Sequence, residues 1–207
     1  MMTRVLLPAP NGPLAGLEAS PPGGAAYYSS AVLVPGHGAK EDFVPLMQLL
    51  ARDGHRVLTL DHRGQHESAG TAAPAERTPA VLARDLEVAL TAAAARRPVH
   101  LVGHGFGASI AARVLAAAPE KCSTFTVIGT LDADLVPAVA ASGVPALVME
   151  ANQPPDEAAV GDQTLAAQLG ARLLRVSGAR GVPHLDSPAA VAEGLLSLWR
   201  AYQRVHR

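Results

Sequence analysis

The stretch PVHLVGHGFGASIAAR, Pro98 to Arg113, decides the fold of this chain. Its first part, Val99 to Val102, is an apolar run with the length and composition of a short buried strand. Glycine then occupies every second position from Gly103 to Gly107, and the residues that follow are rich in alanine, which favours a helix. The stretch therefore predicts a strand, a tight turn and a helix in direct succession.

The turn Gly103-His104-Gly105-Phe106-Gly107 has the spacing of the G-x-S-x-G elbow, which displays a nucleophile on a sharp strand-to-helix turn. Glycines suit the outer positions because such a turn leaves little room for side chains. The central position, where the nucleophile would stand, is Gly105, which has no side chain to attack with. We therefore expect an elbow that does not support ordinary serine-dependent hydrolysis.

Composition narrows the class of protein. The chain has 207 residues, 49% of them hydrophobic and 17% charged, which predicts one globular domain over residues 1–207. A net charge of -1 gives no reason to expect nucleic acid or a membrane surface as a partner. The single cysteine, Cys122, excludes an internal disulfide, and no run resembles a signal peptide or a membrane span, so we expect a cytoplasmic protein. Arginine outnumbers lysine and alanine is abundant, a composition associated with GC-rich bacterial genes.

The order of expected elements predicts the architecture. Two short strands, Arg4 to Pro8 and Leu14 to Ala19, are joined by the hairpin signal Asn11-Gly12. Strands and helices then alternate: we expect strands at 31–34, 56–60, 99–102, 125–128, 146–149 and 172–176, and helices at 41–53, 79–96, after the elbow, at 134–141, 156–169 and 188–205. This order indicates an α/β fold with a mostly parallel central sheet of about eight strands and helices on both faces. A ligand is expected outside the carboxyl ends of the strands.

Five stretches together resemble the α/β-hydrolase superfamily. The elbow LVGHGFG is similar to the family's LVGHSFG. LVPGHG at Leu33 to Gly38 is similar to the family's oxyanion loop, and LDHRGQHES at Leu60 to Ser68 is similar to its D-x-R-G-x-G-x-S segment, with His66 at the second glycine. VPALVM before Glu150 is similar to the strand that precedes the catalytic acid. GARGVPHLDSPAAVAEGLL from Gly178 is similar to the terminal segment GAGHxPHLExPxxVAxxLL. The resemblance covers almost the whole chain and implies an α/β-hydrolase fold. Residues 129–145 leave no room for the cap domain that many members insert, so we expect a capless form.

The resemblance leaves two alignments of the catalytic triad open. In the first, the ungapped match to PHLE places the family's histidine at Gly181 and its acid at Pro154, so all three triad members are absent. In the second, His184 is the general base, the acid is Asp132 or Asp156, and the serine alone is missing.

The oxyanion loop and the elbow supply the remaining candidates. The resemblance implies that the backbone N–H groups of His37, which follows Gly36, and of Phe106 form an oxyanion hole. The His37 side chain would face the pocket mouth, where it is a candidate acid or base or an exposed loop residue. His104 beside the elbow is expected to pack against the strand.

Other reactive side chains are assigned structural positions. His62 and His66 lie four residues apart in a loop without a metal-binding pattern, so we predict no metal site and no cofactor. Cys122 and Trp199 are expected in the core.

Three functional hypotheses follow. The first is a protein that binds a small organic carbonyl or acyl compound, with a non-hydrolytic acid–base step (cyclisation, lyase or isomerisation chemistry) as its catalytic form. The second is a serine esterase or thioesterase inactivated by glycine at position 105. The third is a non-catalytic binding protein, in which a homodimer mate or another partner closes the lidless pocket.

Overall fold

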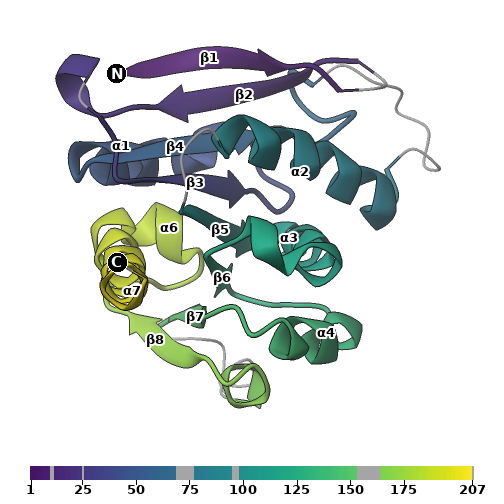
Figure 1. Ribbon diagram of the computed structural model, residues 1–207, viewed down its shortest axis with the longest axis vertical. Helices are drawn as coiled ribbons and strands as arrows, with labels where there is room; N and C mark the ends of the chain where they lie inside the picture. The colour runs from purple at the N-terminus through teal and green to yellow at the C-terminus, as the bar shows by residue number, and fades with distance from the viewer. Residues whose placement is uncertain (10–11, 25, 69–76, 95–97, 153–163, 207) are drawn as a thin grey trace.

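The structure is a computed structural model of the 207-residue chain (Figure 1). It describes residues 1–9, 12–24, 26–68, 77–94, 98–152 and 164–206. No helix in these ranges is long and apolar enough to cross a membrane.

One eight-stranded sheet forms the centre of the molecule, with strand order β1-β2-β4-β3-β5-β6-β7-β8. The strands are β1 Met2–Leu7, β2 Leu14–Ala19, β3 Ser29–Val34, β4 His55–Leu60, β5 Val99–His104, β6 Thr124–Ile128, β7 Ala146–Ala151 and β8 Arg172–Val176. β1 and β2 form an antiparallel hairpin, β2 pairs antiparallel with β4, and the strands from β4 to β8 are parallel. The carboxyl ends of six parallel strands therefore meet at one edge of the sheet.

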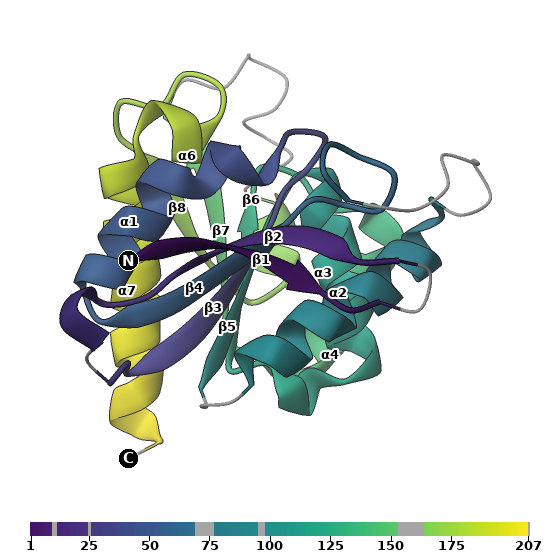
Figure 2. The same ribbon diagram turned by 90° about the horizontal axis from the view of Figure 1, so that it is seen from above.

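Helices cover both faces of this sheet (Figure 2). The helices are α1 Val44–Arg52, α2 Pro79–Ala93, α3 Phe106–Ala117, α4 Val136–Ala141, α6 Pro183–Asp186 and α7 Pro188–Val205, with short 3-10 turns η1 Pro22–Gly24, η2 Lys40–Phe43, η4 Pro119–Lys121 and η5 Ala133–Leu135. α1 and α7 pack on one face and α2, α3 and α4 on the other, and each layer encloses its own apolar core. The central strands β3, β5, β6 and β7 are buried along nearly their whole length, which explains why apolar residues dominate them.

Most of the predicted elements are confirmed, and the differences have local causes. The predicted helix at 41–53 is divided into η2 and α1, because Pro45 fits the first turn of a new helix. α2 ends at Ala93, where the Ala94 N–H donates to the Leu90 carbonyl, although we expected this helix to extend to 96. Of the helix expected at 156–169, residues 156–163 lie outside the described part, and residues 164–168 are helical.

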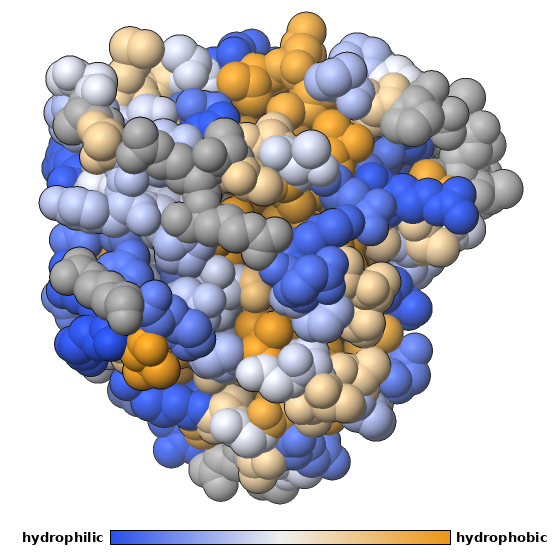
Figure 3. Space-filling view, in the orientation of Figure 1, coloured by the Kyte–Doolittle hydropathy of each residue, from blue (hydrophilic) through white to orange (hydrophobic). Residues whose placement is uncertain are grey.

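The connection between β6 and β7 contains η5 and α4 and no cap domain. Cys122 and Trp199 are buried in the core, as predicted. On the face shown in Figure 3, apolar groups gather toward the upper edge, on the side of β1 and α2. Residues of β1 and α2 line a surface hollow together with Pro8 and Lys121: Leu7, Arg84, Glu87, Val88, Thr91 and Ala92.

Two buried histidines of the sheet, His55 and His100, contact Trp199 of α7. The His100 ring of β5 stacks on the Trp199 indole with a centroid distance of 4.4 Å and an interplanar angle of 5°. The His55 ring approaches the same indole edge-on at 5.0 Å. His100 Nδ1 hydrogen-bonds with Thr124 Oγ1 at 2.9 Å, while its Nε2 has no partner within the described ranges. Burial, and to a smaller extent His55, lowers the pKa of His100 from 6.5 to about 3.

We expect the substitution His100→Gln to reduce the loss of stability in acid. His100 stays neutral in the fold down to about pH 3, whereas an unfolded histidine takes up a proton below pH 6.5, so stability falls as the pH falls through this window. One such group accounts for up to about 1.4 kcal/mol per pH unit, and glutamine does not titrate. Denaturant unfolding of both proteins from neutral pH to about pH 4, followed by the fluorescence of the single tryptophan, measures the two slopes. Equal slopes would contradict the assignment.

Candidate functional site

The chain turns sharply between β5 and α3, as the elbow motif predicts. Gly105 has φ 51° and ψ -119°, a left-handed conformation that L residues adopt only under strain. Its N–H donates to the Ile128 carbonyl of β6 at 3.0 Å, and its own carbonyl accepts from the Ala108 N–H at 2.9 Å. A Cβ added at Gly105 would meet no atom within 4 Å. The elbow is therefore formed, and open space lies where its side chain would stand.

The outer glycines of the elbow are required by packing. A Cβ at Gly107 would overlap the carbonyl oxygens of Val34 and Pro35 at the end of β3. A Cβ at Gly103 would overlap the backbone of Ala108. Both positions lie where one backbone passes directly against another, so they need glycine whether or not a nucleophile stands between them.

The loop after β3 lies against the elbow. A Cβ at Gly36 would be 3.0 Å from the His104 carbonyl oxygen and 3.8 Å from the Phe106 amide nitrogen. Among the described residues, no hydrogen-bond acceptor takes the backbone N–H of His37 or of Phe106. The Phe106 N–H also stands at the first turn of the 12-residue helix α3, where the helix dipole favours a negative ligand atom. Two unoccupied donors thus flank the open space at Gly105.

A buried ion pair holds this loop in place. Lys40 and Asp61 are 1% and 0% exposed, and Lys40 Nζ lies 2.6 Å from Asp61 Oδ2. The Lys40 N–H donates to Asp61 Oδ1 at 3.0 Å, so one carboxylate binds both the backbone and the side chain of Lys40. Burial alone would lower the pKa of Lys40, but its bonds to Asp61, Glu41 and Glu67 raise it above its ordinary value. Lys40 is therefore a permanently charged structural group.

Two further bonds attach the loop after β4. The Arg63 guanidinium donates from Nε to Asp85 Oδ2 of α2 at 2.9 Å, and both side chains are buried. His62 is also buried, and its Nε2–H donates to the Pro35 carbonyl at 2.7 Å. The bonds made by His62 and by Lys40 connect the loop after β4 directly to the loop after β3.

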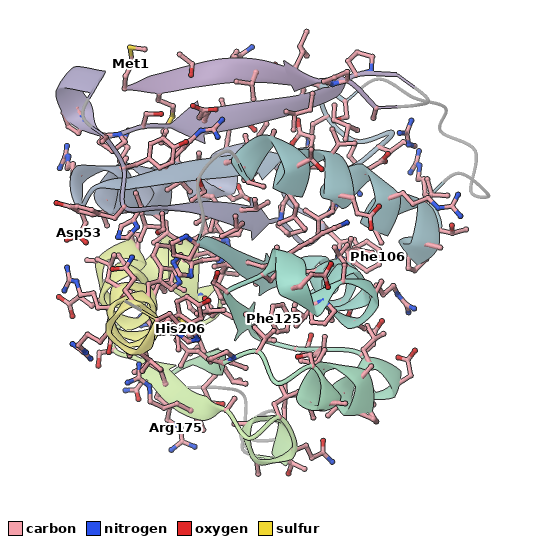
Figure 4. The ribbon with its side chains drawn as sticks, viewed as in Figure 1. Met1, Asp53, Phe106, Phe125, Arg175 and His206 are labelled. Carbon is pink, nitrogen blue, oxygen red and sulfur yellow. The ribbon has the colours of Figure 1, made fainter. Side chains whose placement is uncertain are left out.

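The side chain of His37 is exposed at the site. Its ring stacks on the Phe106 ring, with a centroid distance of 5.2 Å and an interplanar angle of 25°. Figure 4 marks Phe106 at the start of α3. The His37 imidazole is therefore exposed to solvent and held beside the Phe106 ring at the start of α3.

His184 is in a different environment. It lies in α6 and is buried, with its ring stacked on Phe43 at 4.4 Å and set edge-on against His104 at 4.6 Å. Burial, and then His104, lowers the pKa of His184 to about 3, against a smaller opposing effect of Asp186. Burial also lowers the pKa of His104, which Asp42 opposes. His184 and His104 therefore stay neutral near neutral pH.

The structure describes some of the positions of the two triad alignments. Asp132 is half exposed at the start of η5, and Arg113 lies 3.9 Å away. Among the described residues, no hydrogen bond or ion pair joins Asp132 to His184. Gly181 lies in an exposed turn, and its N–H donates to Asp186 Oδ2 at 2.9 Å. Pro154 and Asp156 lie outside the described residues.

No group of three or more histidine, cysteine, aspartate or glutamate side chains within the described ranges could hold a metal ion. The His62 ring is hydrogen-bonded to the Pro35 carbonyl, and His66 is exposed with φ 45°.

Sequence reasoning did not find Lys40, Asp85 or Glu150. Lys40 lies two residues after the expected oxyanion loop, and nothing in the sequence marks it as buried. Asp85 is the one charged residue among the buried positions of α2, and a buried carboxylate needs a basic partner. Glu150 stands near the end of the apolar strand β7, which extends to Ala151 and so includes a residue that we expected to follow the strand.

The chain belongs to the alpha/beta hydrolase fold family, whose family model matches residues 23–186. This match covers the elbow, the loop after β3 and the segment that contains His184.

Solved structures of this fold support the assignment. A predicted CIB-like hydrolase from Thermoplasma acidophilum superposes with a TM-score of 0.82 at 13% identity, covering 97% of this chain and 99% of that protein. The thioesterase domain from the curacin biosynthetic pathway gives a TM-score of 0.81 at 12% identity, covering 95% of this chain and 99% of the domain. An epoxide hydrolase from Vigna radiata gives 0.56 at 15% identity, over 62% of this chain and 40% of that enzyme. At these identities the likeness concerns the fold alone.

Proposed function

We propose that this chain binds a small organic carbonyl or acyl compound at the junction of the loop after β3 and the elbow, without forming a covalent acyl intermediate. The observation that carries the proposal is the pair of free backbone donors, on His37 and Phe106, beside the open space at Gly105. Two N–H groups without an acceptor, on a loop and an elbow that lie against each other, suit a carbonyl oxygen. Where the bound compound reacts, His37 is the exposed imidazole beside it, suited to a non-hydrolytic proton transfer.

The experiment separates the Phe106 N–H from the Phe106 ring. Phe106→Pro removes the N–H at a helix position that tolerates proline, whereas Phe106→Ala keeps the N–H and removes the ring. Isothermal titration of hexanamide and of a hexanoyl thioester is expected to show binding to the wild type. We expect Phe106→Pro to weaken this binding roughly tenfold relative to Phe106→Ala, since one hydrogen bond to a buried carbonyl is lost. Equal affinities of the two variants, or no binding by the wild type, would contradict the proposal.

A second candidate function is a serine hydrolase inactivated at the elbow. One observation favours it: Gly105 already has the strained elbow backbone, with room for a side chain. Gly105→Ser tests it by hydrolysis of an activated acetate ester. We expect no gain over the wild type, because the ring of His184 is enclosed by Phe43 and His104. Clear turnover that His184→Ala abolishes would establish the inactivated hydrolase in place of our proposal.

A further inference from the structure

Glu150 of β7 has a carboxylate oxygen with no partner. The residue is 2% exposed, and its Oε1 accepts a hydrogen bond from Arg175 Nε of β8 at 2.6 Å. Its Oε2 is buried and has no hydrogen-bond partner within the described residues. A buried oxygen of this kind costs free energy unless a donor reaches it, so it marks a place where a ligand donor would be bound favourably.

Sheet register places Glu150 in one row with the elbow. His104 pairs with Ile128, Ile128 with Met149, and Glu150 with Arg175. The ladder continues one residue further, since the Gly105 N–H donates to the Ile128 carbonyl at 3.0 Å and the Gly129 N–H to the Met149 carbonyl at 2.8 Å. Gly105, Gly129, Glu150 and Arg175 therefore follow one another across β5 to β8. In Figure 4 Arg175 marks the β8 end of this row.

The row between the elbow and Glu150 carries no side chain. Gly105 and Gly129 both have positive φ, 51° and 81°, and a Cβ added at either would meet no atom within 4 Å. Neighbouring strands lie about 4.8 Å apart, so Glu150 is about two strand spacings, or ~10 Å, from Gly105 along the sheet. A compound whose carbonyl is bound by the Phe106 N–H would extend across Gly129 toward the Glu150 carboxylate.

We propose that Glu150 Oε2 accepts a hydrogen bond from the bound compound, so that the site prefers carbonyl compounds with an ammonium group about 5 to 10 Å from the carbonyl. This inference rests on the proposed function, because the elbow donors must first hold the carbonyl. Arg175 leaves Oε2 to the ligand because it occupies Oε1. Asp132 and Asp134, on the connection between β6 and β7, are half exposed or more and lie within 4 Å of Arg113.

The test compares hexanamide with ε-aminohexanamide, which differ in one terminal ammonium group. We expect the wild type to bind ε-aminohexanamide roughly tenfold more tightly in isothermal titration. Glu150→Gln keeps the size of the side chain and is expected to abolish this preference while leaving the affinity for hexanamide within about twofold. Glu193→Gln, which removes the same charge from an exposed position of α7, is expected to keep the preference.

The outcomes separate the two proposals. If the wild type binds neither amide, the proposed function fails. If it binds hexanamide but shows no preference for ε-aminohexanamide, or if the preference survives Glu150→Gln, the role of Glu150 is wrong and the elbow site stands. Should Glu150→Gln not fold, Gly129→Ala provides the second test, because it places a methyl group in the row without changing any charge. The preference is then expected to fall at least threefold, and an unchanged preference would overturn the inference.

Discussion

Replacing Asp61 by alanine is expected to lower the free energy of unfolding by about 3 kcal/mol or more, because it leaves a buried ammonium without its main partner. Lys40 is 1% exposed, and Asp61 binds both its Nζ and its backbone N–H. The other acceptors of Lys40, Glu41 and Glu67, are about half exposed and hold it from the solvent side. Denaturant unfolding followed by tryptophan fluorescence measures the loss.

Two companion variants show whether the buried charge is the cause. Glu67→Ala removes a half-exposed partner of the same lysine and is expected to cost much less stability than Asp61→Ala. Lys40→Met combined with Asp61→Leu replaces the pair by apolar side chains and is expected to be more stable than Asp61→Ala alone. If Asp61→Ala unfolds at the same denaturant concentration as Glu67→Ala, the pair does not hold the loop.

The consequence for the site is direct. Lys40 follows the loop that contains Gly36 and the free His37 N–H, and Asp61 follows β4, the neighbour of β3. With the pair intact, the loop that carries the His37 N–H is held against the loop after β4 before any ligand arrives, and the proposed binding needs a donor that is fixed in this way. The charged pair is therefore part of the architecture of the site, although neither residue needs to contact a ligand.

The fold was largely predictable because its signals are local. α7 spans 188–205 and β8 spans 172–176, as expected, because the apolar positions of each element have the period of a helix or of a buried strand. α6 was missed because its four residues are too few to show any period. The end of β7 was placed early because Glu150 interrupts an apolar run, and only Arg175 on the next strand explains why an acidic residue stays within the sheet.

The site was predictable only in its backbone. The glycines that shape the elbow and the loop after β3 are visible as a motif, and the structure forms both turns. The surroundings of His184 could not be inferred in the same way, because they depend on Phe43 and His104, which are distant in the sequence. The same holds for the pairing of Lys40 with Asp61, since charges that meet across two loops leave no periodic signal.

Gly107→Ala is expected to lower the free energy of unfolding by about 3 kcal/mol or more, and to leave little folded protein at physiological temperature. The added methyl group would overlap the carbonyl oxygens of Val34 and Pro35, and these belong to backbone that cannot rotate away as a side chain can. Relief would require α3 to move away from β3, which would open the core beneath Ala108 and Ile110. Circular dichroism during thermal unfolding measures the effect.

Gly105→Ala is the matched control, because it adds the same methyl group two residues earlier on the same turn. There the Cβ meets no atom within 4 Å, so the expected cost is only the strain of a positive φ, about 1–2 kcal/mol. A larger loss for Gly105→Ala than for Gly107→Ala would contradict this account. If the expected order is found, the outer glycines of the elbow are held by the contact of α3 with β3, whatever residue stands between them. The elbow motif then identifies the fold, and the proposed binding at the His37 and Phe106 N–H groups needs its own test.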